Sequence, residues 1–381
     1  MQGTIRGRTG ATWRAFPSFR LPGLGLVLVL FVLLRIAYSS MGAISHTIVP
    51  ESPWVRQCAL DFGIQTHTAP LQVKLVGVWQ RWDACWYEKI ATRNYDRADP
   101  AIAFLPLFPL LMHAAGRVVG GNFTLGGLIV SALAYLLAMV GLYRLVRDDF
   151  GDQIARRTVV FTSIFPTAFF LFMPYTEALF LALSVWTIAL ARRGVWGLAA
   201  GLAFCAGLTR MPAVLLALPL AWEVVRHWRD GRACRLALLA QMAPAAGFLS
   251  YNAYSSHALG WSYFTALGTW DNHQVPLWTA LAASWRYVQH YWQPVEMLNL
   301  GLLVLFMLLL LPATRQLPFS YTLYAAAQLF LIGCRYCSLT PLMSGARYLL
   351  VVFPIFIVLA ILCDRPWRQF LWVSFSLVAL L

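Results

Sequence analysis

Charged residues are scarce in this chain, and that scarcity excludes most soluble folds. Only 12% of its 381 residues are charged and 60% are hydrophobic, whereas soluble domains carry about 25% charged residues. The longest polar interval, from about Ser45 to Pro100, is the size of a loop and too short for a separate soluble domain. The composition therefore predicts an all-α, polytopic membrane protein with lipids as its surroundings.

Lysine is almost absent. Lys74 and Lys89 are the only two, so arginine supplies nearly all of the positive charge behind the net charge of +14. A basic chain can bind nucleic acid, but that needs a basic stripe on one face. Here the arginines form short blocks between apolar runs, which is how orientation is specified in a membrane protein. We therefore expect no nucleic-acid partner.

Cysteine offers no metal site. The seven cysteines are scattered, and Cys334 and Cys337 form a C-x-x-C without the second pair or histidines that zinc spacing requires. We interpret that pair as buried apolar residues. Whether Cys58 and Cys85 form a disulfide in the first loop is left open. Phosphate-binding and protease motifs such as the P-loop or H-E-x-x-H are also missing.

Apolar runs long enough to span a bilayer are abundant, since a span needs about 20 residues. The first follows four arginines and shows no clean cleavage site, so we interpret it as an uncleaved anchor. The candidate spans are Leu24–Ile44, Leu125–Leu145, Leu236–Tyr254, Met297–Pro312, Leu317–Gly333, Arg347–Cys363 and Trp367–Leu381.

Two longer apolar runs are interrupted by a proline and a charge. Val159–Ala191 is broken at Pro174–Glu177, and Val195–Val225 is broken at Thr209–Pro212. Proline removes a backbone donor, and a charge is costly in lipid. Each run is therefore expected to form two short helices that turn at one membrane face.

The positive-inside rule fixes the orientation. All later arginine clusters fall inside with the N-terminus if both interrupted runs are helix pairs and if Ala101–Gly120 lies along the outer leaflet without crossing. This gives about eleven transmembrane helices. The expected organisation is a basic cytoplasmic N-terminus over 1–23 and one membrane domain over 24–381, with a first extracytoplasmic loop over 45–120 that carries amphipathic helices. The C-terminus is expected outside.

Five polar segments then reach the same outer face: the Ser45–Pro100 loop, Pro174–Glu177, Thr209–Arg210, the His257–Glu296 loop and Tyr336–Arg347. This arrangement is typical of a site built on loops over a helical scaffold. The richest segment is Val78–Ile90, in which Trp79, Trp82, Trp86 and Ile90 recur at helical spacing. We expect an amphipathic interfacial helix with Asp83 at its edge, where a carboxylate is either paired with Arg81 or Lys89 or used in chemistry.

The other segments supply further candidates. Glu177 opens a helix, where an acid also suits the helix dipole. Arg210 and Arg347 lie at the outer boundary, where arginine either extends to the interface or binds a lipid phosphate through paired hydrogen bonds. Arg35 lies inside the first span and should face the bundle interior, toward a carboxylate or phosphate. Asp271 and His273 are candidate substrate contacts in a tryptophan-rich loop.

An ordered set of motifs resembles the PIG-V-type mannosyltransferases. The segment Trp79–Ala91 resembles that family's first-loop motif, and Phe104–Leu111 is similar to its proline- and phenylalanine-rich block. The match continues in order through Phe165–Phe170, Tyr175–Phe180, Leu208–Arg210 and Arg347–Leu349, and spans about Arg35 to Ile361. One departure is Met211-Pro212, where the family pattern places proline directly after the arginine.

The resemblance implies a GT-C glycosyltransferase fold. It implies an inverting transfer of mannose, or a related sugar, from a polyprenyl or dolichyl phosphate carrier to a lipid-linked or glycan acceptor on the extracytoplasmic face. The family's catalytic base carries over to Asp83, with Glu177 as a supporting acid or metal ligand. Substrate and lipid-phosphate contacts are expected from Arg35, Arg81, Trp82, Tyr87, Tyr175, Arg210, Asp271, His273 and Arg347. The acceptor does not carry over.

Two other classes of function stay open at this point. Interrupted helices also occur in transporters, although their breaks lie near the bilayer midplane, and a non-catalytic scaffold could share the fold. A divalent cation, Mg²⁺ or Mn²⁺, is left open as a cofactor. The chain length favours a prokaryotic plasma membrane over the endoplasmic reticulum.

Overall fold

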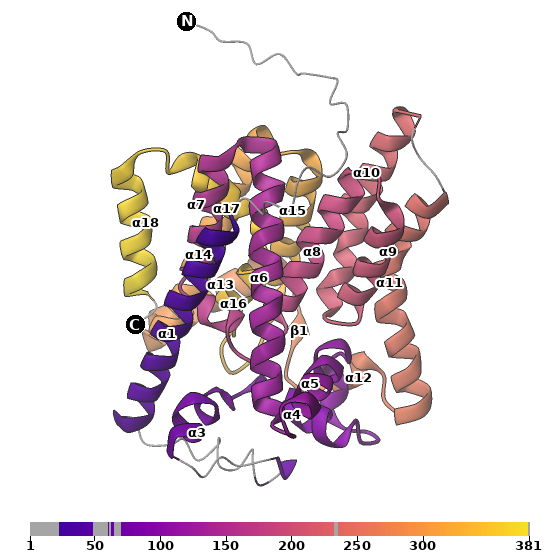
Figure 1. The fold of residues 1–381 in the computed structure, drawn as a ribbon, viewed down its shortest axis with the longest axis vertical. Coiled ribbons are helices and arrows are strands. Elements are labelled where there is room, and N and C mark those ends of the chain that lie inside the picture. Colours follow the sequence, from indigo (N-terminus) through magenta and orange to yellow (C-terminus); the bar gives the residue numbers. More distant parts are fainter. Residues whose placement is uncertain (1–22, 49–59, 61, 65–69, 232–234, 380–381) are drawn as a thin grey trace, which may run out of the picture.

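The computed structural model describes residues 23–48, 60, 62–64, 70–231 and 235–379, and these residues are almost entirely helical (Figure 1). In chain order the first half contains α1 (Leu24–Ile48), α3 (Pro70–Leu75), η1 (Gly77–Trp79), α4 (Asp83–Arg93), η2 (Pro100–Ala103), α5 (Leu107–Val118), α6 (Phe123–Phe150), α7 (Asp152–Ser163), η3 (Ala168–Leu171), α8 (Glu177–Arg192), α9 (Trp196–Gly207), η4 (Met211–Leu216) and α10 (Ala217–Arg229).

The second half continues with helices and adds one short strand pair. It contains α11 (Arg235–Tyr254), η5 (Ser255–Leu259), α12 (Tyr263–Gly268), β1 (His273–Gln274), α13 (Leu277–Tyr291), α14 (Pro294–Gln316), α15 (Phe319–Gly333), β2 (Arg335–Tyr336), α16 (Gly345–Leu349), α17 (Phe353–Leu362) and α18 (Pro366–Val378). β1 and β2 pair antiparallel, with Gln274 opposite Arg335. The predicted all-helical fold is confirmed.

Three of the helices, α1, α6 and α14, are long and apolar enough to cross a membrane. The others are shorter, and the two interrupted runs form the expected helix pairs. The first pair is α7 and α8, separated by residues 164–176, which contain Pro166, the short η3 and Pro174. The second pair is α9 and α10, separated at Arg210 and Pro212 by η4. Each break follows from a proline that cannot donate a helix hydrogen bond.

The basic clusters gather at one end of the bundle, which we call the basic end. Arg192 and Arg193 at the end of α8 pair with Asp149 and Asp148 at the end of α6, at 2.7 and 2.6 Å. Arg157 near the start of α7 donates to the Asp364 carbonyl oxygen beyond the end of α17. These contacts agree with the expectation from the positive-inside rule that the arginine clusters share one side.

The opposite end, which we call the site end, is covered by short helices. Figure 1 shows α4, α5 and α12 together to the right of the lower end of α6, with α3 to its left. The segment Ala101–Gly120 contains only η2 and the 12-residue α5, which at 1.5 Å per residue is too short to cross a bilayer. This agrees with the expectation that it does not span.

Three local predictions are wrong. The expected helix over Val78–Ile90 begins only at Asp83, because Trp82 has a backbone φ of 52° that cannot continue a helix. Trp79 is therefore buried in η1 instead of sharing a face with Trp86. The expected span Arg347–Cys363 is divided into α16 and α17 at Leu350–Val352. The His257–Glu296 loop contains the 15-residue α13, which was not predicted.

Helices α9 and α11 cross in backbone contact through two glycines. A Cβ on Gly207 would lie 2.2 Å from the Pro244 carbonyl oxygen, and one on Gly247 would lie 2.2 Å from the Phe204 carbonyl oxygen. Small residues allow such close approach between membrane helices. The crossing matters for function because Gly207 lies just before Thr209 and Arg210.

Gly207→Ala should reduce stability by about 1–3 kcal/mol, since the added methyl must push two backbones apart. The matched control is Gly201→Ala on the same helix, where a Cβ meets nothing within 4 Å, so that variant should unfold at or slightly above the wild-type temperature. Thermal unfolding of the purified protein in detergent makes the comparison. Equal stability of the two variants would contradict the close crossing.

Candidate active site

A fully buried carboxylate holds two arginines from distant segments. Glu177, the first residue of α8, is 0% exposed, and its Oε1 lies 2.7 Å from Arg210 NH1 and 3.0 Å from Arg347 Nε. Its Oε2 is also buried and has no hydrogen-bond partner among the described residues. An unpaired buried charge is costly, so Glu177 depends on the two guanidinium groups as much as they depend on it.

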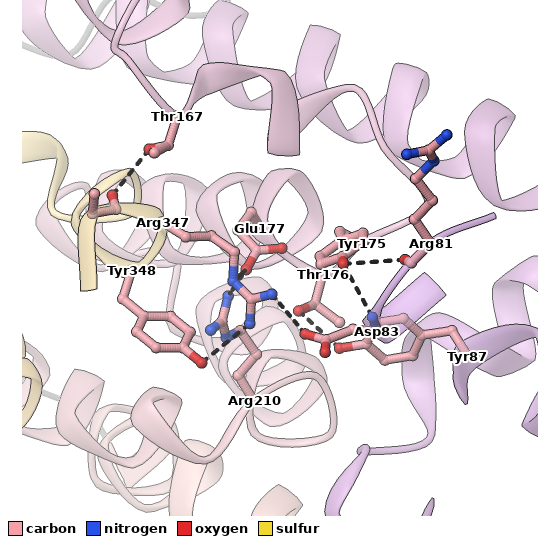
Figure 2. A network of polar contacts seen from close by, with 11 residues as sticks. Arg81, Asp83, Tyr87, Thr167, Tyr175, Thr176, Glu177, Arg210, Arg347 and Tyr348 are labelled. Carbon is pink, nitrogen blue, oxygen red and sulfur yellow. Dashed lines mark hydrogen bonds and ion pairs between the residues drawn. The ribbon is translucent and has the colours of Figure 1, made fainter. Parts of the chain in front are cut away.

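Asp83 joins the same cluster from the first loop. Its Oδ2 accepts a hydrogen bond of 2.6 Å from Arg347 NH1, so Arg347 bridges the two carboxylates (Figure 2). The two acids differ in exposure, because the Asp83 side chain is 27% exposed and that of Glu177 is not exposed at all. The described residues give Asp83 Oδ1 no hydrogen-bond partner. Asp83 is thus the carboxylate of this cluster that a substrate can reach.

Tyr175 fixes the backbone at the start of α4. The Asp83 N–H donates to the Tyr175 hydroxyl at 3.0 Å, and that hydroxyl donates to the Arg81 carbonyl oxygen at 3.3 Å. These bonds hold both sides of Trp82, whose backbone conformation at φ 52° and ψ −126° is rare for a residue with a side chain. The backbone strain at Trp82 therefore lies next to the Asp83 carboxylate.

Two further contacts anchor α4 to the bundle. The Tyr87 hydroxyl lies 3.3 Å from Thr176 Oγ1, directly before Glu177. Glu88 Oε2 accepts bonds from Gln80 and from Thr124 at the start of α6, both at 2.8 Å. Burial raises the pKa of Glu88 to about 7, against the opposing effect of those two hydrogen bonds.

Arg347 is positioned by residues that the sequence analysis missed. Asn299, one turn into α14, accepts the Ala346 N–H at 2.9 Å, and Thr167 donates to the Ala346 carbonyl oxygen at 3.0 Å. Both polar groups of the Ala346 residue, directly before Arg347, are therefore fixed. The buried Glu296 accepts the Leu342 N–H at 2.9 Å and orders the same loop. Only the polar character of Asn299 and Glu296 within an apolar helix could have drawn attention to them.

Three guanidinium groups lie against one tyrosine ring. The Cζ atoms of Arg335, Arg347 and Arg210 lie 4.4, 4.9 and 5.0 Å from the Tyr348 ring centroid. The Tyr348 hydroxyl also accepts a bond of 3.1 Å from Arg347 NH2. Aromatic faces attract cations most strongly where water is excluded. Arg335 was not among the predicted site residues.

Asp271 and His273 lie in a neighbouring cluster. Asp271 accepts the Ser338 N–H at 2.8 Å and lies 2.9 Å from His273 Nε2. The Ser338 N–H, together with His273, lowers the pKa of Asp271 below its usual range. Neither residue contacts Asp83 or Glu177. The link between the clusters is Asn272, whose Oδ1 accepts a bond of 2.9 Å from Arg335 Nε.

The remaining candidates lie at the edges of the cluster. Arg35 NH1 donates to the Phe172 carbonyl oxygen at 2.9 Å, and its Cζ lies 5.0 Å from the Trp79 ring. It therefore faces the bundle interior, as expected, but there it contacts a carbonyl oxygen and a ring in place of the expected carboxylate or phosphate. Figure 2 shows the Arg81 side chain pointing away from the cluster. Trp82 is exposed.

The charged cluster is not arranged as a metal site. No group of three or more His, Cys, Asp or Glu side chains that could hold a metal ion occurs among the described residues. Asp83 and Glu177 both contact Arg347, which takes the position that a cation between the two carboxylates would need. A metal role for Glu177 thus gains no support from this geometry.

Cys85 takes part in a disulfide bond. Cys58, its partner in the disulfide left open from sequence, lies outside the residues that the structure describes. Cys334 and Cys337 are free, as the interpretation of the C-x-x-C as apolar residues expected.

Comparisons with known proteins agree with the fold. A family model described as dolichyl-phosphate-mannose-protein mannosyltransferase matches residues 104–243. A solved structure, ArnT from Cupriavidus metallidurans bound to undecaprenyl phosphate, matches with a TM-score of 0.52 and 12% sequence identity, over 91% of this chain and 63% of that chain. A comparison with curated proteins finds no match. The chain therefore shares the fold of ArnT, and the match over residues 104–243 agrees with the resemblance to mannosyltransferases seen in the sequence.

Glu177→Gln should destabilise the protein by about 3–5 kcal/mol, because it leaves the buried guanidinium of Arg210 without a carboxylate and removes one of the two that contact Arg347. The control is Asp364→Asn, which removes an exposed partner of Arg368 and should cost about 0–1 kcal/mol. Thermal unfolding in detergent measures both. A Glu177→Gln variant as stable as the control would show that the buried cluster does not hold these segments together.

Proposed function

We propose that this protein is a membrane glycosyltransferase that moves a sugar from a polyprenyl or dolichyl phosphate carrier to a hydroxyl acceptor, with inversion. Mannose is the first sugar to test, because the matching family model is described by dolichyl-phosphate-mannose. The polyprenyl carrier is supported by the undecaprenyl phosphate bound to the similarly folded ArnT. A lipid-linked or glycan acceptor and the PIG-V-type relationship rest on the sequence motifs.

The proposal rests on one observation, the exposed carboxylate of Asp83 beside a cluster of arginines. Asp83 Oδ2 is held by Arg347 while Oδ1 remains available. The acceptor hydroxyl would give its proton to that carboxylate as its oxygen bonds to the anomeric carbon. The bond from the anomeric carbon to the phosphate oxygen breaks, and its electron pair leaves with the lipid phosphate. A positioned base of this kind contributes about 10²–10⁴-fold.

The arginines would stabilise the departing phosphate. Arg210 and Arg347 face the same cluster with side chains only 12% and 10% exposed, and a preorganised charge acts strongly where water is excluded. Glu177 holds both groups in place from a position that substrate does not reach. We therefore assign Glu177 to positioning, in place of the acid or metal ligand expected from sequence.

The depth of the cluster suits a lipid-linked donor. Ser131 on α6 donates to the Tyr175 carbonyl oxygen, and Ser131 lies about two turns, roughly 12 Å, from the start of α6. The cluster thus lies inside the bundle, inward from the site end, where α4 and α5 cover it. A carrier whose phosphate enters from the bilayer would meet Asp83 at this depth.

A transporter would need its polar breaks near the bilayer midplane, with access from both sides. Here the breaks that carry Glu177 and Arg210 join one cluster toward the site end, while ion pairs such as Arg192–Asp149 link the helices at the basic end. This asymmetry favours the enzyme.

The direct assay incubates purified protein with polyprenyl-phosphate-linked mannose and a lipid extract as acceptor pool, and follows release of polyprenyl phosphate and the mass of the product. Donors carrying other hexoses or pentoses, and nucleotide sugars, form the parallel arms. Release from a polyprenyl donor and not from a nucleotide sugar supports the proposal. If the protein consumes none of the polyprenyl donors, the proposal is excluded.

Asp83→Asn should lower transfer by at least about 10²-fold while lowering the unfolding temperature less than Glu177→Gln does, since Asp83 is partly exposed and Arg347 keeps its contact with Glu177. The matched control is Asp96→Asn, an exposed acid of the same loop that lies 3.5 Å from Lys89, and it should keep full turnover. Near-normal transfer by Asp83→Asn would remove this residue from the role of base.

Asn299→Ala and Thr167→Val should each lower kcat about tenfold with little change in KM, because each removes one of the two bonds that fix Ala346 before Arg347. Since both act on one residue, the double variant should lose less than the product of the two single losses. Thr314→Val on α14, which removes a local bond to Leu311, is the control. The positioning role would be contradicted if the variants lowered stability without lowering kcat, or if the kcat losses of the two single variants simply multiplied in the double variant.

A further inference from the structure

The charges of the cluster do not balance. Three guanidinium groups, those of Arg210, Arg335 and Arg347, surround Tyr348. Two carboxylates, Asp83 and Glu177, contact Arg210 and Arg347. Among the described residues Arg335 forms no ion pair; its polar contact is the neutral amide of Asn272. Of the three arginines around Tyr348, Arg335 is therefore the one without an acidic partner among the described residues.

The three arginines also differ in the donors that they retain. Both terminal nitrogens of Arg347 are engaged, NH1 by Asp83 and NH2 by the Tyr348 hydroxyl, while its Nε lies 3.0 Å from Glu177 without forming a hydrogen bond. Arg335 uses only Nε, and its two terminal nitrogens have no partner among the described residues. Those terminal nitrogens are the pair that binds a phosphate through parallel hydrogen bonds.

Arg335 is held in place by a rigid frame. Its guanidinium stacks on Tyr348 with Cζ 4.4 Å from the ring centroid, and β2 pairs with β1 so that Arg335 lies opposite Gln274. The Asp271 carboxylate binds Ser338 through both its N–H and its hydroxyl, at 2.8 and 3.1 Å, which ties the loops on either side together. Asp271 and His273 thus act on the site through this frame.

We infer that Arg335 binds the phosphate of the lipid carrier and takes up the negative charge that develops when the sugar leaves. This inference rests on the proposed transfer. The donor phosphodiester carries one negative charge, and the released polyprenyl phosphate carries close to two. The guanidinium without an acidic partner among the described residues matches that carrier, while Arg347 remains bonded to the base.

The test measures binding of polyprenyl phosphate and of polyprenol, which lacks the phosphate, by competition with the donor. Arg335→Gln should weaken polyprenyl phosphate binding by about 10- to 100-fold, the range for losing hydrogen bonds to a charged group, and leave polyprenol binding unchanged. Arg335→Lys keeps the charge without the fork and should recover part of the loss. Arg97→Gln, an exposed arginine of the first loop, controls for general charge and should bind like the wild type.

Asn272→Ala separates phosphate binding from loop structure. It removes the bond to Arg335 Nε but keeps the guanidinium, so its loss should be clearly smaller than that of Arg335→Gln. Equal losses in the two variants, or a loss that extends to polyprenol, would overturn the inference in favour of a structural role. The inference would also be overturned if the wild-type protein is active and Arg335→Gln binds polyprenyl phosphate as tightly as the wild type does. If the wild-type protein itself shows no turnover, the result counts against the proposed function.

Discussion

The contact on which the site depends is the buried carboxylate of Glu177 between Arg210 and Arg347. None of these charges could remain in an apolar bundle alone, because an unpaired buried ion costs several kcal/mol. Each of the three comes from a place where a helix begins or a run of helix is interrupted. Because these charges must pair, the three interrupted segments that carry them are held together at one place in the bundle. Asp83 is then attached to that point through Arg347.

The short helices are what make room for this cluster. α7 and α9 are each 12 residues long and end well before the site end, so the segments that follow them turn inside the bundle. Backbone left without helical partners there needs others, as when the Leu107 N–H donates to the Leu208 carbonyl oxygen. α4 and α5 cover the resulting recess. The short length that weakens α7 and α9 as membrane spans thus leaves room for the charged cluster inside the bundle.

Sequence patterns predicted the helices, both helix pairs and four members of the central cluster, because apolar runs, prolines and intramembrane charges are local signals. They could not predict that Asp83 pairs with Arg347, since the two are 264 residues apart and Arg81 and Lys89 were nearer along the chain. Lys89 is instead occupied by Asp99 at 2.6 Å. The start of α4 was missed because the break at Trp82 depends on Tyr175 from another segment. Asn299 and Arg335 act through backbone and ring contacts that produce no periodic pattern in the sequence.

The carboxylate that we propose as the base is also bonded to an arginine. In the proposed reaction this pairing is useful, because the bond to Arg347 occupies Oδ2 and fixes the orientation of Oδ1 toward the acceptor. When Asp83 takes the acceptor proton it loses its negative charge. Arg347 then has one charged carboxylate beside it in place of two, at the moment when the phosphate gains charge. The positive potential at the phosphate then rises as the leaving group departs. Arg335 provides that potential from the start, and Arg347 adds to it only as the proton moves.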